Sequence, residues 1–124
     1  MSKMLQSFNT IIEELKSDLG DGFVASDIWQ SKDAHSLAGY NSQPKAVALF
    51  NEVTRTLNKT LAGADYPSLG DYYMVHLDNG LVVVIITSGD YQQGMLVDLS
   101  KTTMGILMSV VLPKVLKNLQ EATS

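Results

Sequence analysis

The sequence predicts an α+β fold in the order helix, strand, strand, helix, three strands, helix, with helices on both faces of the sheet. Between Asp71 and Asp98, three strand-like runs follow one another with only short turns, which is typical of an antiparallel meander. Helical patterns stand before and after this meander. The run Leu81–Ile86 is apolar at consecutive positions, so both faces of that strand must be covered.

The N-terminal part predicts a helix followed by a hairpin. Apolar residues recur at helical spacing after Ser2, a suitable N-cap, and the pattern ends at Gly20-Asp21-Gly22. Residues 23–29 then predict a strand, residues 30–33 a turn, and residues 34–40 a returning strand.

The second predicted helix starts at Pro44, after a cap at Asn41 or Ser42, and ends near Gly63. We expect its apolar stripe to face the core: Ala46, Leu49, Phe50, Val53, Leu57 and Leu61. About 100° around the helix lies a second row, free of charge: Val47, Asn51, Thr54, Asn58 and Ala62. Short uncharged side chains permit close helix approach, so this row predicts a homodimer interface, with a merely solvated face as the alternative.

The meander and the last helix complete the chain. Residues 72–77, 81–87 and 91–97 predict the three strands, the first two joined by the hairpin signal Asp78-Asn79-Gly80. The third helix is expected to open at Asp98 or Ser100 and to run to about Glu121.

The first half of this third helix is apolar nearly all round. Pro113 should bend the helix, because proline removes one backbone hydrogen bond. Ile106 and Val110 lie off the core stripe, so either the first helix or a partner protein is expected to cover them.

Composition excludes several classes of protein. A net charge of −4 disfavours a nucleic-acid partner, because phosphate binding depends on clustered Lys and Arg. No cysteine is present, which rules out disulfides and thiol chemistry. Without a secretory signal pattern or an apolar run near the ~20 residues of a membrane span, we expect one cytoplasmic domain over residues 1–124 with no membrane partner.

Catalytic motifs are also missing, so we expect neither an enzyme nor a cofactor or metal. His35 and His76 have no second ligand at metal-binding spacing. Gly89 and Gly94 are not followed by the Lys and Ser or Thr of a phosphate loop. The lone arginine, Arg55, suits an arginine finger toward a GTPase, although a solvated helix charge is the default interpretation.

The chain resembles the Roadblock family of dynein light chains and their prokaryotic relatives over essentially its whole length. The resemblance rests on the hairpin Phe23–Tyr40, the helix Pro44–Leu61, the strands around Asp78-Asn79-Gly80, and the helix after Asp98. It implies a five-stranded antiparallel sheet with the second helix on one face and the first and third on the other. It also implies a homodimer in which the second helices pack antiparallel and the sheets join through the third strand.

The function implied by this resemblance is that of a non-catalytic adaptor, a scaffold, or a regulator of a small Ras-like GTPase. Tyr73 and Val75 would then lie at or near the dimer seam, and Ile106 and Val110 are candidates for a partner-facing patch. Two alternatives remain open: a small-molecule-sensing module with a pocket between sheet and helices, and a structural subunit of a larger assembly.

Overall fold

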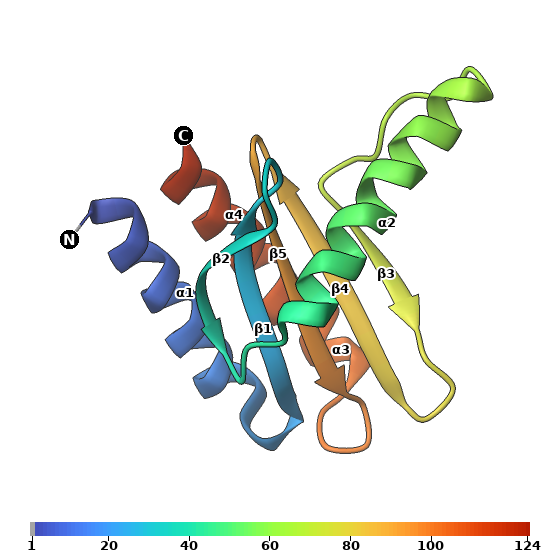
Figure 1. The fold of residues 1–124 in the computed structure, drawn as a ribbon. Helices are drawn as coiled ribbons and strands as arrows, with labels where there is room; N and C mark the ends of the chain where they lie inside the picture. The colour runs from blue at the N-terminus through green and yellow to red at the C-terminus, as the bar shows by residue number, and fades with distance from the viewer. Residues whose placement is uncertain (1) are drawn as a thin grey trace.

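The computed structural model describes residues 2–124 and confirms the predicted fold class (Figure 1). The elements follow in the order α1 (Lys3–Leu19), the 3-10 turn η1 (Gly20–Gly22), β1 (Phe23–Gln30), β2 (His35–Tyr40), α2 (Pro44–Gly63), β3 (Tyr72–His76), β4 (Leu81–Ser88), β5 (Tyr91–Asp98), α3 (Met104–Ile106), the π-helical segment η2 (Leu107–Val111) and α4 (Leu112–Thr123). The strands form one antiparallel five-stranded sheet in the order β2-β1-β5-β4-β3. The edge strands are therefore β2 and β3.

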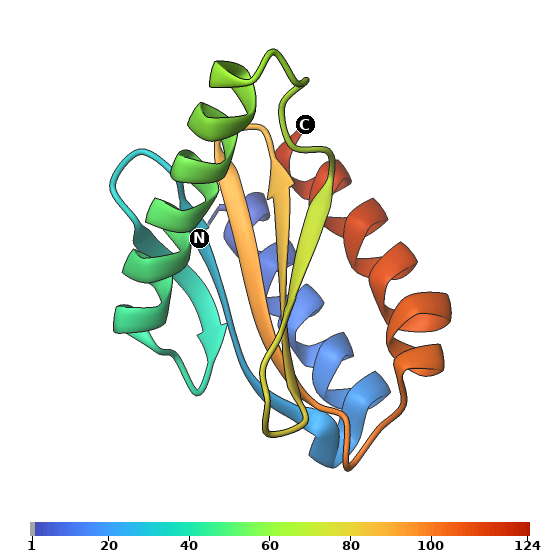
Figure 2. The ribbon, with the colours of Figure 1, turned by 90° about the vertical axis from the view of Figure 1, so that its right-hand side faces the viewer.

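Helices cover both faces of this sheet. Figure 2 shows α2 on one side and α1 with α4 on the other. Strand β4 contacts both layers, as its unbroken apolar run predicts: Val82 and Val84 join the larger core under α1 and α4, whereas Val83 and Ile85 join a smaller core under α2. The α2 side thus has the smaller of the two cores.

The start of the last helix differs from the sequence prediction. Thr103, rather than Asp98 or Ser100, is the N-cap, and its Oγ1 accepts a hydrogen bond of 3.1 Å from the backbone N–H of Ile106. Strand β5 continues through Asp98, which pairs with Leu81. The Asp98 carboxylate instead accepts hydrogen bonds from the backbone and side chain of Ser100, closing a local turn that precedes the helix.

Pro113 lies just beyond a widened turn of this helix. The N–H of Leu112 bonds to the carbonyl of Leu107, five residues back, so η2 has π-helical geometry. Pro113 then occupies the first turn of α4, where its missing N–H leaves no hydrogen bond broken. The π-helical turn accommodates the proline at the point where the sequence predicted a bend.

A glutamine in the larger core provides a stability prediction. Gln93 has no exposed surface, and its backbone neighbours across the sheet are Ile28 and Ile86. Its Nε2 donates to Ser26 Oγ at 3.3 Å, but its Oε1 has no partner among the described residues. We expect Gln93→Leu to raise the free energy of unfolding by about 1–2 kcal/mol, because it removes an unsatisfied buried carbonyl.

Urea denaturation would measure this gain. Gln92→Leu is the matched control: Gln92 Oε1 also has no partner among the described residues, but Gln92 Nε2 donates to Asn51 at 2.7 Å and to Ser31 at 2.9 Å, so the loss of both hydrogen bonds should destabilise the fold. An unchanged or lower midpoint for Gln93→Leu would contradict the prediction.

Within residues 2–124, none of the helices has both the length and the hydropathy that crossing a bilayer requires.

Candidate interaction site

The side of α2 that faces the sheet is not the side that the sequence predicted. Val47 and Thr54 are the buried residues of α2, with exposed fractions of 3% and 6%. Val47 packs in the smaller core with Trp29, Val83 and Ile85. The row predicted to form a homodimer interface therefore holds α2 against its own sheet.

Polar groups on the sheet explain this orientation. Asn51 Oδ1 accepts hydrogen bonds from Trp29 Nε1 at 3.0 Å and from Gln92 Nε2 at 2.7 Å. Its Nδ2 donates to the carbonyl of Ser31 at 3.0 Å. Because buried donors on the sheet need acceptors, a polar row on α2 satisfies them where an apolar row would not.

The rest of the row varies in exposure. Asn58 Oδ1 accepts a hydrogen bond of 2.9 Å from the backbone N–H of Leu69, which links α2 to the loop before β3. Ala62, at the end of the row, is exposed. The dimer contact of this row stays a prediction, but Val47 and Thr54 are covered by their own chain and offer a partner no surface.

The apolar stripe that was expected in the core is only partly covered, so that expectation was wrong, although Phe50 packs against the edge of the smaller core. None of its members is buried, and Leu49 is 56% exposed. The stripe consists of Ala46, Leu49, Phe50, Val53, Leu57 and Leu61, and its first three members share a groove with Leu77, which follows β3. We call these six residues the α2 stripe.

An apolar groove of about 290 Å³ runs between the N-terminal half of α2 and the sheet. Side chains from α2, from three strands and from the turn after β3 line it, among them Ala46, Leu49, Phe50, Leu77, Val83 and Leu96. Gly94 lies in its floor, where a Cβ atom would be 3.2 Å from the Trp29 ring. Leu77 is 40% exposed, so both walls of the groove present apolar surface to the exterior.

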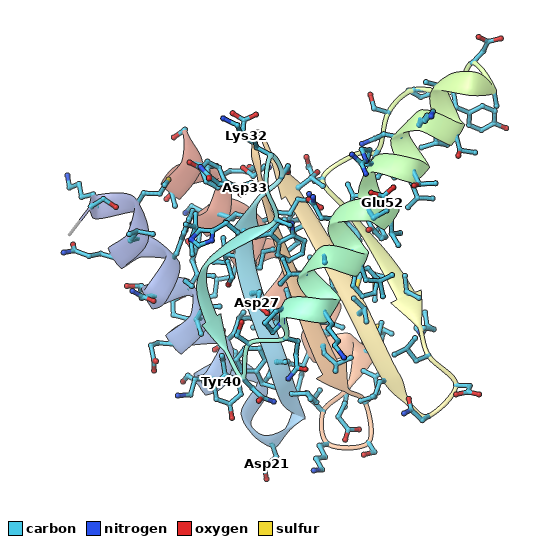
Figure 3. All side chains as sticks on the ribbon, viewed as in Figure 1. Asp21, Asp27, Lys32, Asp33, Tyr40 and Glu52 are labelled. Carbon is cyan, nitrogen blue, oxygen red and sulfur yellow. The ribbon has the colours of Figure 1, made fainter. Side chains whose placement is uncertain are left out.

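Asp27 closes the groove at the start of α2 (Figure 3). Only 5% of this residue is exposed. Its Oδ1 accepts hydrogen bonds from the Ser36 and Ser42 hydroxyls at 2.7 and 2.5 Å, and its Oδ2 accepts one from the Gln43 N–H at 3.0 Å. A Cβ atom on Gly39 would lie 2.7 Å from Oδ1, so only glycine leaves room for the carboxylate there. Asp27 thus ties β1, β2 and α2 together as a structural anchor.

Strand β3 borders the open side of the groove. It pairs with β4 along one side only, because it is the last strand of the sheet. Tyr73 and Val75, predicted at the dimer seam, are half-buried on the α2 side, and the Tyr73 hydroxyl lies 2.7 Å from Thr54 Oγ1. The unpaired edge and the α2 stripe thus flank the same part of the surface.

This contact predicts a pH dependence of stability. Burial raises the pKa of Tyr73 above its ordinary value, and the hydrogen bond with Thr54 only partly opposes this. The folded protein therefore favours the neutral phenol, so this contribution is complete below about pH 10, the unfolded pKa, and is lost as the pH rises through the folded pKa. Thermal melts of Tyr73→Phe should show less loss of stability above pH 10 and about 1 kcal/mol less stability at neutral pH.

Tyr66→Phe is the control for this experiment, because Tyr66 is 63% exposed. If both variants lose stability in alkali as the parent protein does, Tyr73 is not the responsible group.

The second predicted patch lies in the opposite layer. Ile106 and Val110 are 41% and 50% exposed on α3 and η2, so α1 does not cover them. The groove and this patch therefore belong to different faces of the molecule.

The histidines and the arginine that the sequence analysis considered as functional residues do not lie together in one site. His35 and His76 are exposed, and Arg55 forms an exposed ion pair with Glu52 one turn away on α2. No three His, Cys, Asp or Glu side chains in the described part of the chain are grouped so that they could hold a metal ion.

Comparison with known proteins identifies the class of fold. No protein-family model matches the sequence, and neither does any curated protein. Among solved structures, a Roadblock/LC7 domain from Streptomyces avermitilis aligns with a TM-score of 0.65 at 10% identity, covering 93% of this chain and 96% of that chain. The chain therefore has the Roadblock fold.

Two solved structures align with higher scores. Myxococcus xanthus MglB has a TM-score of 0.81 at 8% identity, covering 99% of this chain and 92% of that chain. The gliding protein MglB from Thermus thermophilus has a TM-score of 0.79 at 8% identity, covering 98% of this chain and 92% of that chain. At these identities the likeness establishes the fold.

Proposed function

We propose that this protein is a non-catalytic homodimeric adaptor or regulator in the cytoplasm that binds a small Ras-like GTPase or serves as a scaffold subunit. One observation carries the proposal: in a Roadblock fold, the partly exposed apolar α2 stripe lies near the unpaired edge of β3. Apolar helix surface next to a free strand edge favours contact with another chain.

A second copy of the same chain suits this surface. A two-fold axis makes each surface meet its own equivalent, so an apolar stripe would meet an apolar stripe and an edge strand would pair with an edge strand. This homodimer uses the α2 stripe together with Tyr73 and Val75 of β3. In this interface the α2 stripe takes the place of Val47 and Thr54, which the sequence analysis predicted at the dimer contact and which are buried within their own chain.

The GTPase partner is proposed from the fold class, since members of the Roadblock family act on or with Ras-like GTPases. Ile106 and Val110 are the proposed contact for such a partner, because they stay exposed on the face that lies away from the α2 stripe. A dimer would present two copies of this patch, which suits a scaffold.

Two measurements test the proposal. Sedimentation equilibrium should give twice the mass of 13.5 kDa. GTP hydrolysis by a small GTPase encoded beside this gene, measured with and without the protein, should change in rate, or the two proteins should co-elute. A monomer that neither binds nor affects any such GTPase would refute the proposal.

The groove favours a second candidate function, a small-molecule-sensing module. Its volume of about 290 Å³ is near the lower limit of ligand pockets, and its walls are apolar. A metabolite that raises the melting temperature of the protein while no GTPase binds would support this function instead.

A further inference from the structure

The turn between β3 and β4 contains an asparagine followed by a glycine, Asn79-Gly80, and both residues are exposed. Figure 1 shows this turn at the lower end of the sheet. A Cβ atom added to Gly80 would meet no atom within 4 Å, so the space around this peptide is open to solvent. The Gly80 N–H donates no hydrogen bond to any of the described residues. The nitrogen of Gly80 is therefore accessible.

The Asn79 side chain is folded toward this nitrogen. Its Oδ1 lies 3.4 Å from the backbone nitrogen of Leu81, two residues further on, which is the arrangement of an Asx turn. In that arrangement the side-chain carbon Cγ lies over the Gly80 peptide. Because glycine has no side chain, nothing on Gly80 itself shields its nitrogen from the Asn79 amide. The two atoms that would close a five-membered ring are thus held near each other.

We propose that Asn79 is a site of spontaneous covalent modification, at which the side-chain amide cyclises and the chain then acquires an isoaspartyl linkage. The Gly80 nitrogen loses its proton to solvent and bonds to Asn79 Cγ, while the side-chain NH₂ takes up a proton and leaves as ammonia. Water then opens the succinimide by breaking one of its two C–N bonds. Breaking the original main-chain bond gives isoaspartate, the main product, and breaking the new bond gives aspartate. This inference does not depend on the proposed function.

The fold protects the other five asparagines from this reaction. Four of them lie inside helices, where the N–H of the following residue donates to the carbonyl of the preceding turn: Asn9, Asn51, Asn58 and Asn118. Asn41 lies in a loop before Ser42, but its Nδ2 donates to the carbonyl of Val24 at 3.1 Å. That hydrogen bond holds the Asn41 side chain toward β1 and away from its own next peptide.

The modification would lengthen the main chain at a turn that is tied to a neighbouring loop. The Gly80 carbonyl accepts a hydrogen bond of 3.0 Å from the N–H of Leu99, in the connection between β5 and α3. An isoaspartyl linkage inserts one extra main-chain carbon before Gly80, so this hydrogen bond cannot keep its geometry. The new carboxylate also adds one negative charge, next to Asp78, to the net charge of −4.

Peptide mapping after incubation for several weeks at neutral pH and body temperature tests the proposal. Trypsin releases residues 60–101 with Asn79 as their single asparagine, and residues 33–45 with Asn41 as theirs. We expect the 60–101 peptide to exchange NH₂ for OH several-fold faster than the 33–45 peptide. It should also accept methyl groups from S-adenosylmethionine through a protein isoaspartyl methyltransferase. Equal rates for the two peptides, or conversion without methyl acceptance, would overturn the proposal.

Asn79→Gln is the matched variant, because glutamine keeps the amide but would have to close a six-membered ring, which is much slower. The mass of its 60–101 peptide should stay constant over the same period. If that peptide converts as fast as in the parent protein, the reaction lies elsewhere and the proposal is overturned.

Unfolding in guanidinium chloride separates the effect of the fold from that of the sequence. It should speed the conversion of Asn41 several-fold, because the hydrogen bond with Val24 is lost, and should leave the rate at Asn79 nearly unchanged. If unfolding accelerates both sites equally, the native turn shields Asn79 and the proposal is overturned.

Amide hydrogen exchange tests the consequence for the fold. Ion exchange separates the more acidic, modified protein, in which the Leu99 N–H should exchange several-fold faster than in the unmodified protein. An unchanged exchange rate at Leu99 would contradict the loss of its hydrogen bond with Gly80.

Discussion

Replacing Asp27 with alanine is expected to lower the free energy of unfolding by about 2–4 kcal/mol, which corresponds to a loss on the order of 10 °C in melting temperature. The carboxylate is the shared acceptor for the hydroxyls of Ser36 and Ser42 and for the N–H of Gln43. Alanine removes all three hydrogen bonds at once and opens a void next to Gly39.

Asp90→Ala separates this effect from a general loss of negative charge, because Asp90 is exposed in the turn between β4 and β5. It should change the melting temperature by no more than a degree or two. Asp27→Asn should fall between the two, since the amide keeps one acceptor oxygen. Equal melting temperatures for Asp27→Ala and Asp90→Ala would show that Asp27 does not anchor α2.

Replacing Leu49 with glutamate should convert the proposed homodimer into monomers. Leu49 is 56% exposed in the single chain, so the change should leave the fold intact. In the dimer, each copy would bury one carboxylate against apolar surface. If each costs about 2 kcal/mol, the dimer dissociation constant rises roughly 1000-fold.

Ala48→Glu is the matched control, since Ala48 is exposed on the same turn of α2 but away from the α2 stripe. Sedimentation should give a dimer for Ala48→Glu and a monomer for Leu49→Glu, with similar circular dichroism for both. A dimer that persists with Leu49→Glu would place the interface elsewhere.

Local sequence signals predicted most of the elements. Asp78-Asn79-Gly80 marked a turn in which Gly80 has a φ of +83°, a conformation that suits glycine. The apolar run of β4 correctly indicated helices on both sides of the sheet. The start of the last helix was misplaced, because the pairing of Asp98 with Leu81 extends β5, and sequence spacing does not reveal that pairing.

The candidate site was harder to predict, because it depends on which side of α2 meets the sheet. Apolar periodicity assigns the apolar side of a helix to the core, as for Leu49 and Leu57. The sheet under α2, however, presents the Trp29 indole and the Gln92 amide, which need a polar partner such as Asn51. Polar residues inside the predicted strands, Gln92 above all, were the available signal.

The hydrogen bond between Trp29 and Asn51 gives the protein an intrinsic optical reporter. Trp29 is the single tryptophan of the sequence, and it is 1% exposed under α2. Its fluorescence maximum should shift to longer wavelength when α2 separates from the sheet, because water then reaches the indole. Emission spectra can thus report the fraction of molecules in which α2 is packed against the sheet, without any added label.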